Sequence, residues 1–343
     1  MQHEIITSKP LLDSLGQLIE PGWCRSALPI YNRAQIASNK LRIKEWDYYF
    51  IGNDAFSLAL TVADNGYMGM ISASLMEYKY KKETTQSFIN PFTLGKKNLP
   101  SSSSFGITTQ DNKNSVITFN VSKGVRTLSA NILNFKDGYP LKADITLTDE
   151  PKESMVIATP FQSNKHAFYY NQKILGMKAS GKISYHGSEY LFSPINSYGL
   201  LDWGRGVWTY ENTWYWGAAQ TTLNGKIFGF NIGYGFGDTK AATENILLYD
   251  GKVHKLDQVS FNIPKNGEKD DFLSPWTFTS NDNRLQFEFT PILDRHADTN
   301  LLLLRSNQHQ VFGKYNGTVI LDDGTILKIH NLIGFAEKVF NRW

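Results

Sequence analysis

The amino-acid sequence predicts an all-β protein built mainly from antiparallel strands, and three observations support this prediction. Phe, Trp and Tyr make up 13% of the 343 residues beside 27 glycines, a composition typical of pleated strands joined by tight turns. Asn-Gly and Asp-Gly pairs recur along the chain, and apolar residues alternate between them. Because such pairs favour two-residue hairpins, neighbouring strands are expected to pair antiparallel.

The individual elements follow from these two patterns. Alternation is clearest at 56–62, 117–121 and 285–289, which we expect to be strands. The best helical candidate is 11–19, and 334–343 is expected to form a last strand or a helical turn. The turn pairs are Asn65-Gly66, Asp137-Gly138, Asn224-Gly225, Asp250-Gly251, Asn266-Gly267, Asn316-Gly317 and Asp323-Gly324.

The length of the chain predicts two hydrophobic cores, because a single core rarely grows to this size. Sheets with many strands hide their edges by closing into barrels or by stacking as sandwiches. A charged, proline-containing break at 149–153 marks the expected boundary, which gives an N-terminal β domain at 1–152 and a C-terminal β domain at 153–343.

Charge and composition disfavour several classes of function. The 35 basic and 32 acidic residues are scattered, so nucleic-acid binding is not expected. The single cysteine, Cys24, excludes an internal disulfide, and neither a signal peptide nor an apolar membrane span is visible; we expect a cytoplasmic protein without stable membrane insertion. The seven histidines show no metal-ligand spacing, so neither a metal nor another cofactor is expected, and the oligomeric state stays open.

One segment concentrates chemistry. Residues 201–216 hold four of the eight tryptophans, Trp203, Trp208, Trp214 and Trp216, together with Asp202, Arg205 and Tyr210. Gly204 and Gly206 flank Arg205 and are expected to let the backbone bend, so that Asp202 and Arg205 project into a common space walled by the indoles.

Two interpretations of this segment remain open. An apolar wall raises the pKa of a carboxyl group, which suits a general acid, whereas a neighbouring arginine favours the anion. In the functional interpretation Asp202 donates or accepts a proton, and Arg205 orients it or anchors a ligand oxygen. In the structural interpretation the two residues form a partly buried salt bridge and the tryptophans belong to the core.

Further candidates lie downstream. Glu211, Glu244 and Glu337 could supply a second carboxylate, with Glu244 preferred, and Asn245 could hydrogen-bond a ligand. Glycines alternate with aromatic residues over 228–237, which leaves one face of a strand open for a ring or for a ligand. Asn231 and Tyr234 in this stretch are therefore candidate ligand-binding residues.

Several motifs resemble a known family. The runs Trp46-Asp47-Tyr48-Tyr49, 201–208 with Trp214-Tyr215-Trp216, and 334–343 look like domain-of-unknown-function family 2804 over nearly the whole chain. More distantly, the second half resembles the lipocalin-like superfamily of carotenoid hydratases, kievitone hydratases and decalin-forming cyclases. This resemblance implies two lipocalin-like β domains and an apolar pocket for lipids, isoprenoids or polyketides. In that superfamily an aspartate next to an aromatic residue or histidine often lies in the ligand region, and the resemblance implies the same place for Asp202. Many relatives have histidine where this chain has Trp203.

Three functions follow as hypotheses. The first is a binding protein that holds a hydrophobic small molecule against aromatic walls, with Asp202 and Arg205 at its polar end. The second is a hydratase, lyase or isomerase in which protonated Asp202 delivers a proton and the rings stabilise cationic character. The third is a carbohydrate-active protein.

Overall fold

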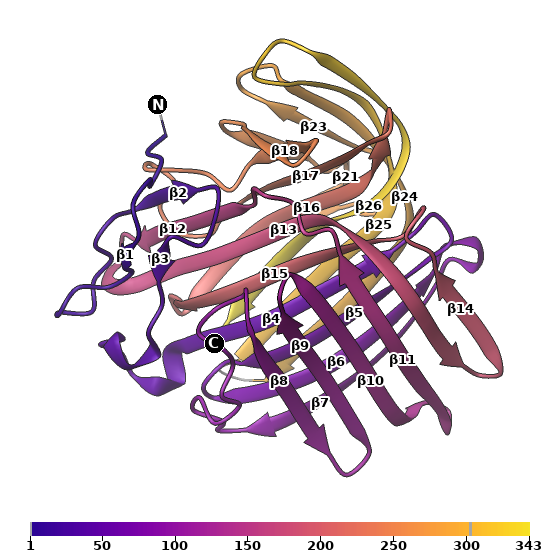
Figure 1. Ribbon diagram of the computed structural model, residues 1–343, viewed down its shortest axis with the longest axis horizontal. Coiled ribbons are helices and arrows are strands. Elements are labelled where there is room, and N and C mark those ends of the chain that lie inside the picture. Colours follow the sequence, from indigo (N-terminus) through magenta and orange to yellow (C-terminus); the bar gives the residue numbers. More distant parts are fainter. Residues whose placement is uncertain (1, 302–303) are drawn as a thin grey trace.

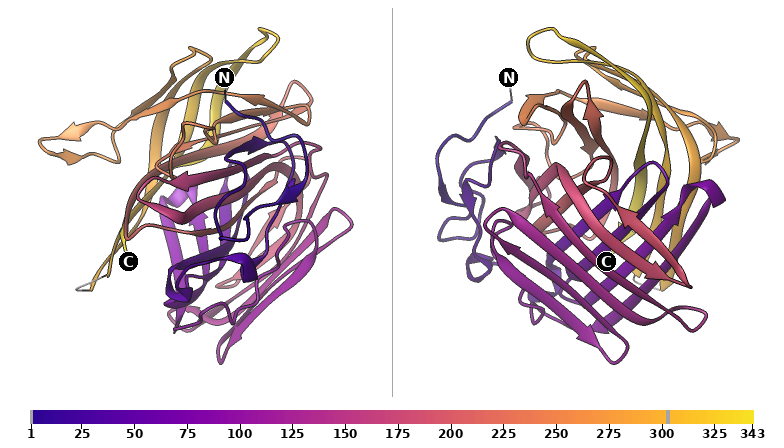
Figure 2. Two further views of the ribbon diagram at one scale, coloured as in Figure 1. Left: turned by 90° about the vertical axis from the view of Figure 1, so that its left-hand side faces the viewer. Right: turned by 45° about the vertical axis from the view of Figure 1, so that its right-hand side comes forward.

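The computed structural model describes residues 2–301 and 304–343, and nearly all of its regular structure is β-strand. Two curled antiparallel sheets face each other, with the first in indigo to rose and the second mostly in orange and yellow (Figure 1). Figure 2 shows that each sheet curls into a half-barrel around its own interior. The predicted all-β class with two packed lipocalin-like domains is therefore confirmed.

The first sheet has thirteen strands, ten of which follow the order β7-β6-β5-β4-β15-β13-β11-β10-β9-β8, while β2, β12 and β14 pair alongside this path. Its strands are β2 (Gly22–Cys24), β4 (Ile43–Gly52), β5 (Phe56–Asp64), β6 (Met68–Glu77), β7 (Lys82–Pro91), β8 (Gly106–Asn112), β9 (Ser115–Ser122), β10 (Val125–Lys136), β11 (Tyr139–Thr148), β12 (Met155–Phe161), β13 (Asn164–Tyr185), β14 (Ser188–Phe192) and β15 (Tyr198–Val207).

The second sheet follows the order β19-β18-β17-β16-β26-β25-β24-β23-β20. Its strands are β16 (Glu211–Leu223), β17 (Lys226–Tyr234), β18 (Ile246–Tyr249), β19 (Lys252–Lys255), β20 (Val259–Asn262), β23 (Trp276–Ser280), β24 (Leu285–Leu301), β25 (Leu304–Ile320) and β26 (Ile326–Arg342).

Small elements complete the described chain. β1 (Lys9–Pro10) pairs parallel with β3 (Pro29–Ile30), and the hairpin of β21 (Lys265–Asn266) and β22 (Lys269–Asp270) projects from the body in Figure 2. Short 3₁₀ turns occur at Arg33–Gln35, Lys40–Arg42 and Tyr78–Tyr80. In the described part of the chain, no helix is long and apolar enough to cross a membrane.

The turn prediction is correct at most positions and wrong at one. Asp137-Gly138, Asn224-Gly225 and Asp250-Gly251 have positive φ at both residues and join adjacent strands, as primed turns require. Asn316-Gly317 instead lies inside β25, where the pairing register with β26 shifts. The extra residue makes a β-bulge there, for which glycine at positive φ is also well suited.

Two further expectations differ from the structure. Residues 11–19 form no helix but a loop with a bridge between Leu12 and Leu18. By contrast, 334–342 belong to β26, which agrees with the expectation of a last strand. The expected boundary at 152–153 lies inside the first sheet, because β12 to β15 pair with its strands. The chain passes from one sheet to the other between Val207 and Glu211.

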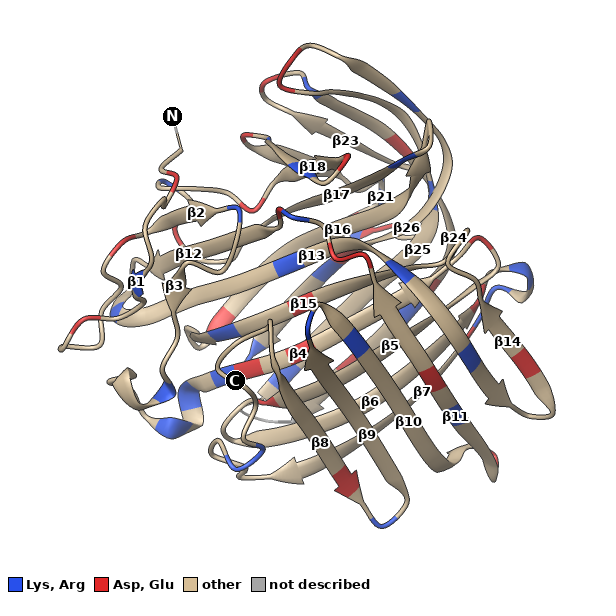
Figure 3. Ribbon diagram, in the orientation of Figure 1, with Lys and Arg blue, Asp and Glu red and all other residues tan. Residues whose placement is uncertain are grey.

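Two groups of buried apolar side chains stabilise the body. One lies within the second sheet and is rich in rings such as Phe230, Trp276 and Tyr315. The other fills the first sheet and extends to Trp216 and Phe335 of the second, so apolar burial also joins the two sheets. Charged residues of both signs are interspersed over both sheets (Figure 3).

Candidate functional site

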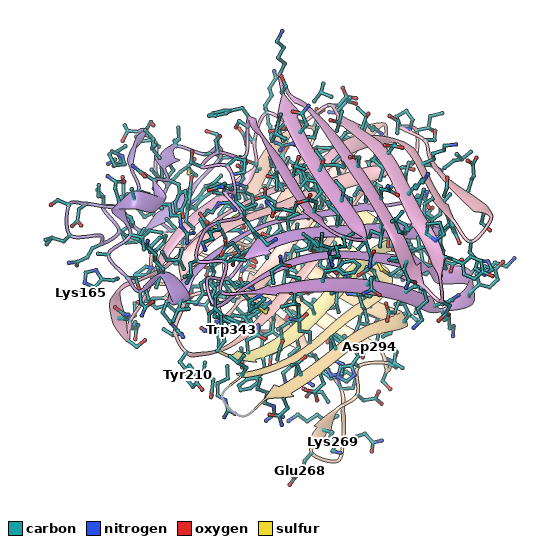
Figure 4. All side chains as sticks on the ribbon, turned by 90° about the horizontal axis from the view of Figure 1, so that it is seen from below. Lys165, Tyr210, Glu268, Lys269, Asp294 and Trp343 are labelled. Atoms are coloured by element: carbon teal, nitrogen blue, oxygen red, sulfur yellow. The ribbon has the colours of Figure 1, made fainter. Side chains whose placement is uncertain are left out.

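A pocket of about 260 Å³ lies between the two sheets and opens to solvent. Strands β4, β5, β6, β13 and β15 line it from the first sheet, and β16, β24, β25 and β26 from the second. Five of the eight tryptophans line it, and its aromatic residues are Trp46, Tyr48, Tyr67, Tyr169, Trp208, Trp214, Trp216, Phe236 and Trp343. In Figure 4, Trp343 lies where the purple strands of the first sheet meet the yellow strands of the second.

Strand alternation decides which residues of β15 face this pocket. Asp202 pairs with Tyr48 of β4, and Gly204 pairs with Trp46. Gly204 and Gly206 lie in an extended strand rather than in the sharp bend that was expected. A Cβ atom on Gly204 would lie 2.0 Å from the Trp46 ring, so the glycine is needed because the indole covers it.

Trp208 is the centre of the aromatic wall. Its ring centroid lies 5.2 Å from that of Trp214, 5.7 Å from Tyr169 and 5.8 Å from Trp46, and all three pairs are edge-to-face. Trp343 closes the group at 6.5 Å from Trp208. Such contacts fix the orientation of the rings and give the pocket a stiff apolar wall.

Asp202 lies on the wall of the pocket as one half of a buried ion pair. Its Oδ1 is 2.9 Å from Nζ of Lys173 and accepts a 2.6 Å hydrogen bond from Nδ2 of Asn171. The ammonium also lies 4.0 Å from the centroid of the Trp216 ring, a cation–π contact. Among the residues that the structure describes, Oδ2 of Asp202 accepts no hydrogen bond, which leaves this oxygen for a ligand or water.

Glu337 brings a second carboxyl group to the same pocket from β26. It accepts hydrogen bonds from Nε1 of Trp214 at 2.9 Å and from Nε2 of Gln310 at 3.0 Å. Burial raises the pKa of this carboxyl from 4.5 to about 7, although the Trp214 donor and the charges of Arg295 and Lys173 oppose the rise. Glu337 can therefore hold or release a proton near neutral pH.

Arg205 does not share a space with Asp202, contrary to the expectation. Positions three residues apart on a strand point to opposite faces, so Arg205 lies on the other side of the first sheet. Its Nη2 is 3.0 Å from Oδ1 of Asp47, and its guanidinium lies 4.1 Å from the Trp203 ring. Trp203 faces this second space as well, where it meets Tyr31 edge-to-face.

The candidates Glu244, Asn231 and Asn245 form a layer behind the pocket wall. Glu244 is buried with a raised pKa, caused mainly by burial, and Tyr169 donates a 3.2 Å hydrogen bond to it. Asn231 accepts from the Trp216 indole at 2.7 Å and donates to the Glu244 carbonyl. Asn245 is engaged with backbone groups of Gly233 and Asp257.

Two aromatic candidates lie away from the pocket lining. Tyr234 stacks on Tyr215 with ring centroids 4.6 Å apart. Tyr210 is exposed and, in Figure 4, lies toward the edge of the molecule from Trp343. The structure thus brings together Asp202, Trp208, Trp214 and Trp216 of the predicted set.

Sequence reasoning missed most of the polar lining, chiefly Lys44, Lys173, Arg295 and Gln310. One signal was available: Lys44, Trp46 and Tyr48 alternate and therefore share one strand face. Glu337 was only one of several possible second carboxylates, because its place beside Trp216 depends on the pairing of β16 with β26.

The fold is that of an all-β protein with two packed antiparallel half-barrels and a pocket between them. The chain belongs to the family described as Domain of unknown function (DUF2804), whose model matches residues 2–343. The resemblance to this family that was inferred from the sequence is thereby confirmed. No curated protein matches the chain.

Solved structures share the architecture. A Nitrosomonas europaea protein with the provisional name AttH aligns with a TM-score of 0.52 and 11% identity, over 90% of this chain and 95% of its own. CghA aligns with a TM-score of 0.50 and 9% identity, over 100% and 97%. Kievitone hydratase from Nectria haematococca has a TM-score of 0.45 and 10% identity, over 98% of each chain. At such identities the similarity concerns the fold alone.

Proposed function

We propose that this protein binds a hydrophobic small molecule, such as a lipid, isoprenoid or polyketide, in the pocket between its sheets. The aromatic-walled cavity supports this proposal most directly, because ligand sites are concavities lined mainly by apolar and aromatic side chains with a few polar groups. Burial of an apolar ligand there contributes about 25 cal/mol per Å² of surface removed from water.

A second function, acid–base catalysis of the hydratase, lyase or isomerase type, is favoured by Glu337. A carboxyl with a pKa of about 7 is a suitable proton donor at neutral pH, and Asp202 beside Lys173 offers an oxygen that can accept a proton. In a hydration, the Glu337 proton would pass to an alkene carbon, water would add to the cation, and a carboxylate would take the proton that water releases. The indole faces of the wall would stabilise the cation. The carbohydrate alternative stays a prediction.

Binding is tested with Nile red, a neutral apolar dye, by fluorescence titration. Thr61 lines the pocket, so Thr61→Phe fills part of it, whereas Thr127 lies on the exposed face of β10. We expect the wild type and the matched Thr127→Phe control to bind the dye equally and Thr61→Phe to bind at least tenfold more weakly. Equal binding by all three proteins would place the dye elsewhere and contradict the proposal.

A further inference from the structure

A buried lysine without an acidic partner lines the pocket at the level of the aromatic group. Lys44 is 2% exposed, and its Nζ donates to the Asn65 carbonyl at 2.8 Å. The nitrogen also lies 4.2 Å from the Tyr67 ring centroid and 5.2 Å from that of Trp343. Within the described ranges it forms no ion pair, although a buried cation normally requires an anion nearby.

The nearest charged groups are already engaged. Asp64 accepts hydrogen bonds from the Thr93 hydroxyl at 2.8 Å and from the Gly95 amide at 2.9 Å. Arg42 donates to the backbone carbonyls of Trp208 and Trp343. Burial, helped by the charge of Arg42 and opposed by that of Asp64, lowers the pKa of Lys44 to about 6.

Other donors in the lining are also unsatisfied. Nε1 of Trp208 and Nε1 of Trp343 are buried and have no partner in the part of the chain that the structure describes. The Asn341 side chain is 1% exposed, lines the same pocket, and makes no hydrogen bond there through either its nitrogen or its oxygen. Buried polar groups are seldom left unpaired, so several donors without partners indicate an acceptor that a ligand supplies.

We propose that the Lys44 end of the pocket binds the carboxylate of a long-chain, otherwise apolar acid. This inference rests on the proposed binding function and specifies its ligand class. An anionic oxygen pair would accept from the Lys44 ammonium and from the indole and amide N–H groups, which are all donors. The Lys44 amine can gain one positive charge, which matches the single charge of a carboxylate better than the double charge of a phosphate monoester.

Strand geometry sets the orientation of such a ligand. Lys44 and Tyr48 lie four residues apart on one face of β4, which corresponds to about 13 Å. Tyr48 is opposite Asp202, whose carboxylate is already paired with Lys173. An acid held by its carboxylate at Lys44 would extend its apolar chain along β4 toward Asp202 and Glu337, roughly 13 Å away.

The test compares dodecanoate with 1-dodecanol by isothermal titration calorimetry at pH 7.5. We expect the wild type to bind the acid at least tenfold more tightly than the alcohol. Lys44→Met removes the amine while keeping the apolar stem, so it is expected to abolish this preference and to leave alcohol and Nile red binding unchanged. Lys142→Met, on the exposed face of β11, is the matched control and should behave as wild type.

A second readout is proton uptake. Lys44 is largely neutral at pH 7.5 in the free protein and becomes charged beside a carboxylate, so dodecanoate binding should take up close to one proton in wild type and none in Lys44→Met. Equal affinity for acid and alcohol, or uptake that persists in Lys44→Met, would overturn the inference and leave the pocket proposal standing. If neither Nile red nor dodecanoate nor 1-dodecanol binds, the proposed function itself is refuted.

Discussion

Replacement of Glu337 by glutamine tests whether this carboxyl holds a proton near neutral pH. Below pH 4.5 the group is protonated in both the folded and the unfolded protein. As the pH rises, the unfolded chain ionises first, and above about pH 7 the folded protein carries the anion at a cost. The difference between 4.5 and about 7 corresponds to about 3 kcal/mol, at about 1.4 kcal/mol per pH unit.

The pocket can accommodate the glutamine. Its carbonyl can accept from Trp214, and Gln310, whose Oε1 is unpaired in the described structure, can rotate its amide to accept from the new NH₂ group. Glu337→Gln carries no charge, so it avoids the cost at high pH. Relative to wild type, the free energy of unfolding of the variant should therefore increase by about 3 kcal/mol between pH 4.5 and pH 8.

The assay is urea unfolding of both proteins at pH values across this window. Subtracting the two curves removes contributions that they share, including those of the buried amines Lys44 and Lys255, whose pKa values are lowered to about 6 and about 7. Glu288→Gln, on the exposed face of β24, should show no such change. A difference between Glu337→Gln and wild type that stays constant with pH would refute the assignment of Glu337 as a neutral-pH proton donor.

Three further predictions concern the walls of the pocket, and urea unfolding at pH 8 measures the stability of each variant. Lys173→Met leaves the Asp202 carboxylate buried without its cation and should cost about 3–5 kcal/mol, much of it regained when Asp202→Asn is added. Gly204→Ala forces a methyl group against the Trp46 ring and should cost about 1–3 kcal/mol while weakening Nile red binding; unchanged values would contradict the packing described. Arg205→Met should lower the free energy of unfolding by about 3 kcal/mol and leave the Nile red affinity of the folded protein unaltered. Loss of Nile red binding without loss of stability would contradict the position of Arg205 outside the pocket.

Much of the fold could be predicted because its signals are local. Turn pairs and alternation each involve a few neighbouring residues, and they identified strands such as β5, β9 and β24. The place of β12 to β15 in the middle of the first sheet could not be predicted, since β13 pairs with β11 while β15 pairs with β4, which lies about 150 residues earlier. Nothing in the local pattern of 149–153 distinguishes a loop within a sheet from a boundary between two sheets.

The candidate site shows the same division. The tryptophans of 201–216 could be identified from their density, and alternation alone separates Asp202 from Arg205, because one odd-numbered step along a strand reverses the face. Lys173 and Glu337 reach the pocket through pairing with β15 and β16, over sequence separations that no local pattern records. The raised pKa of Glu337 depends on burial, which only the folded arrangement determines.

The central proposal is that the pocket between the sheets binds an apolar small molecule, and proton transfer by Asp202 and Glu337 is the second function that the same experiment can test. Untargeted mass spectrometry of a cell extract incubated with wild type, Asp202→Asn or Glu337→Gln tests it most directly. We predict that wild type retains an apolar acid and converts it with time to a product of matching mass, while both variants retain the compound unchanged. A compound converted equally by all three proteins would contradict the roles of Asp202 and Glu337, and the absence of any retained apolar compound would contradict the account as a whole.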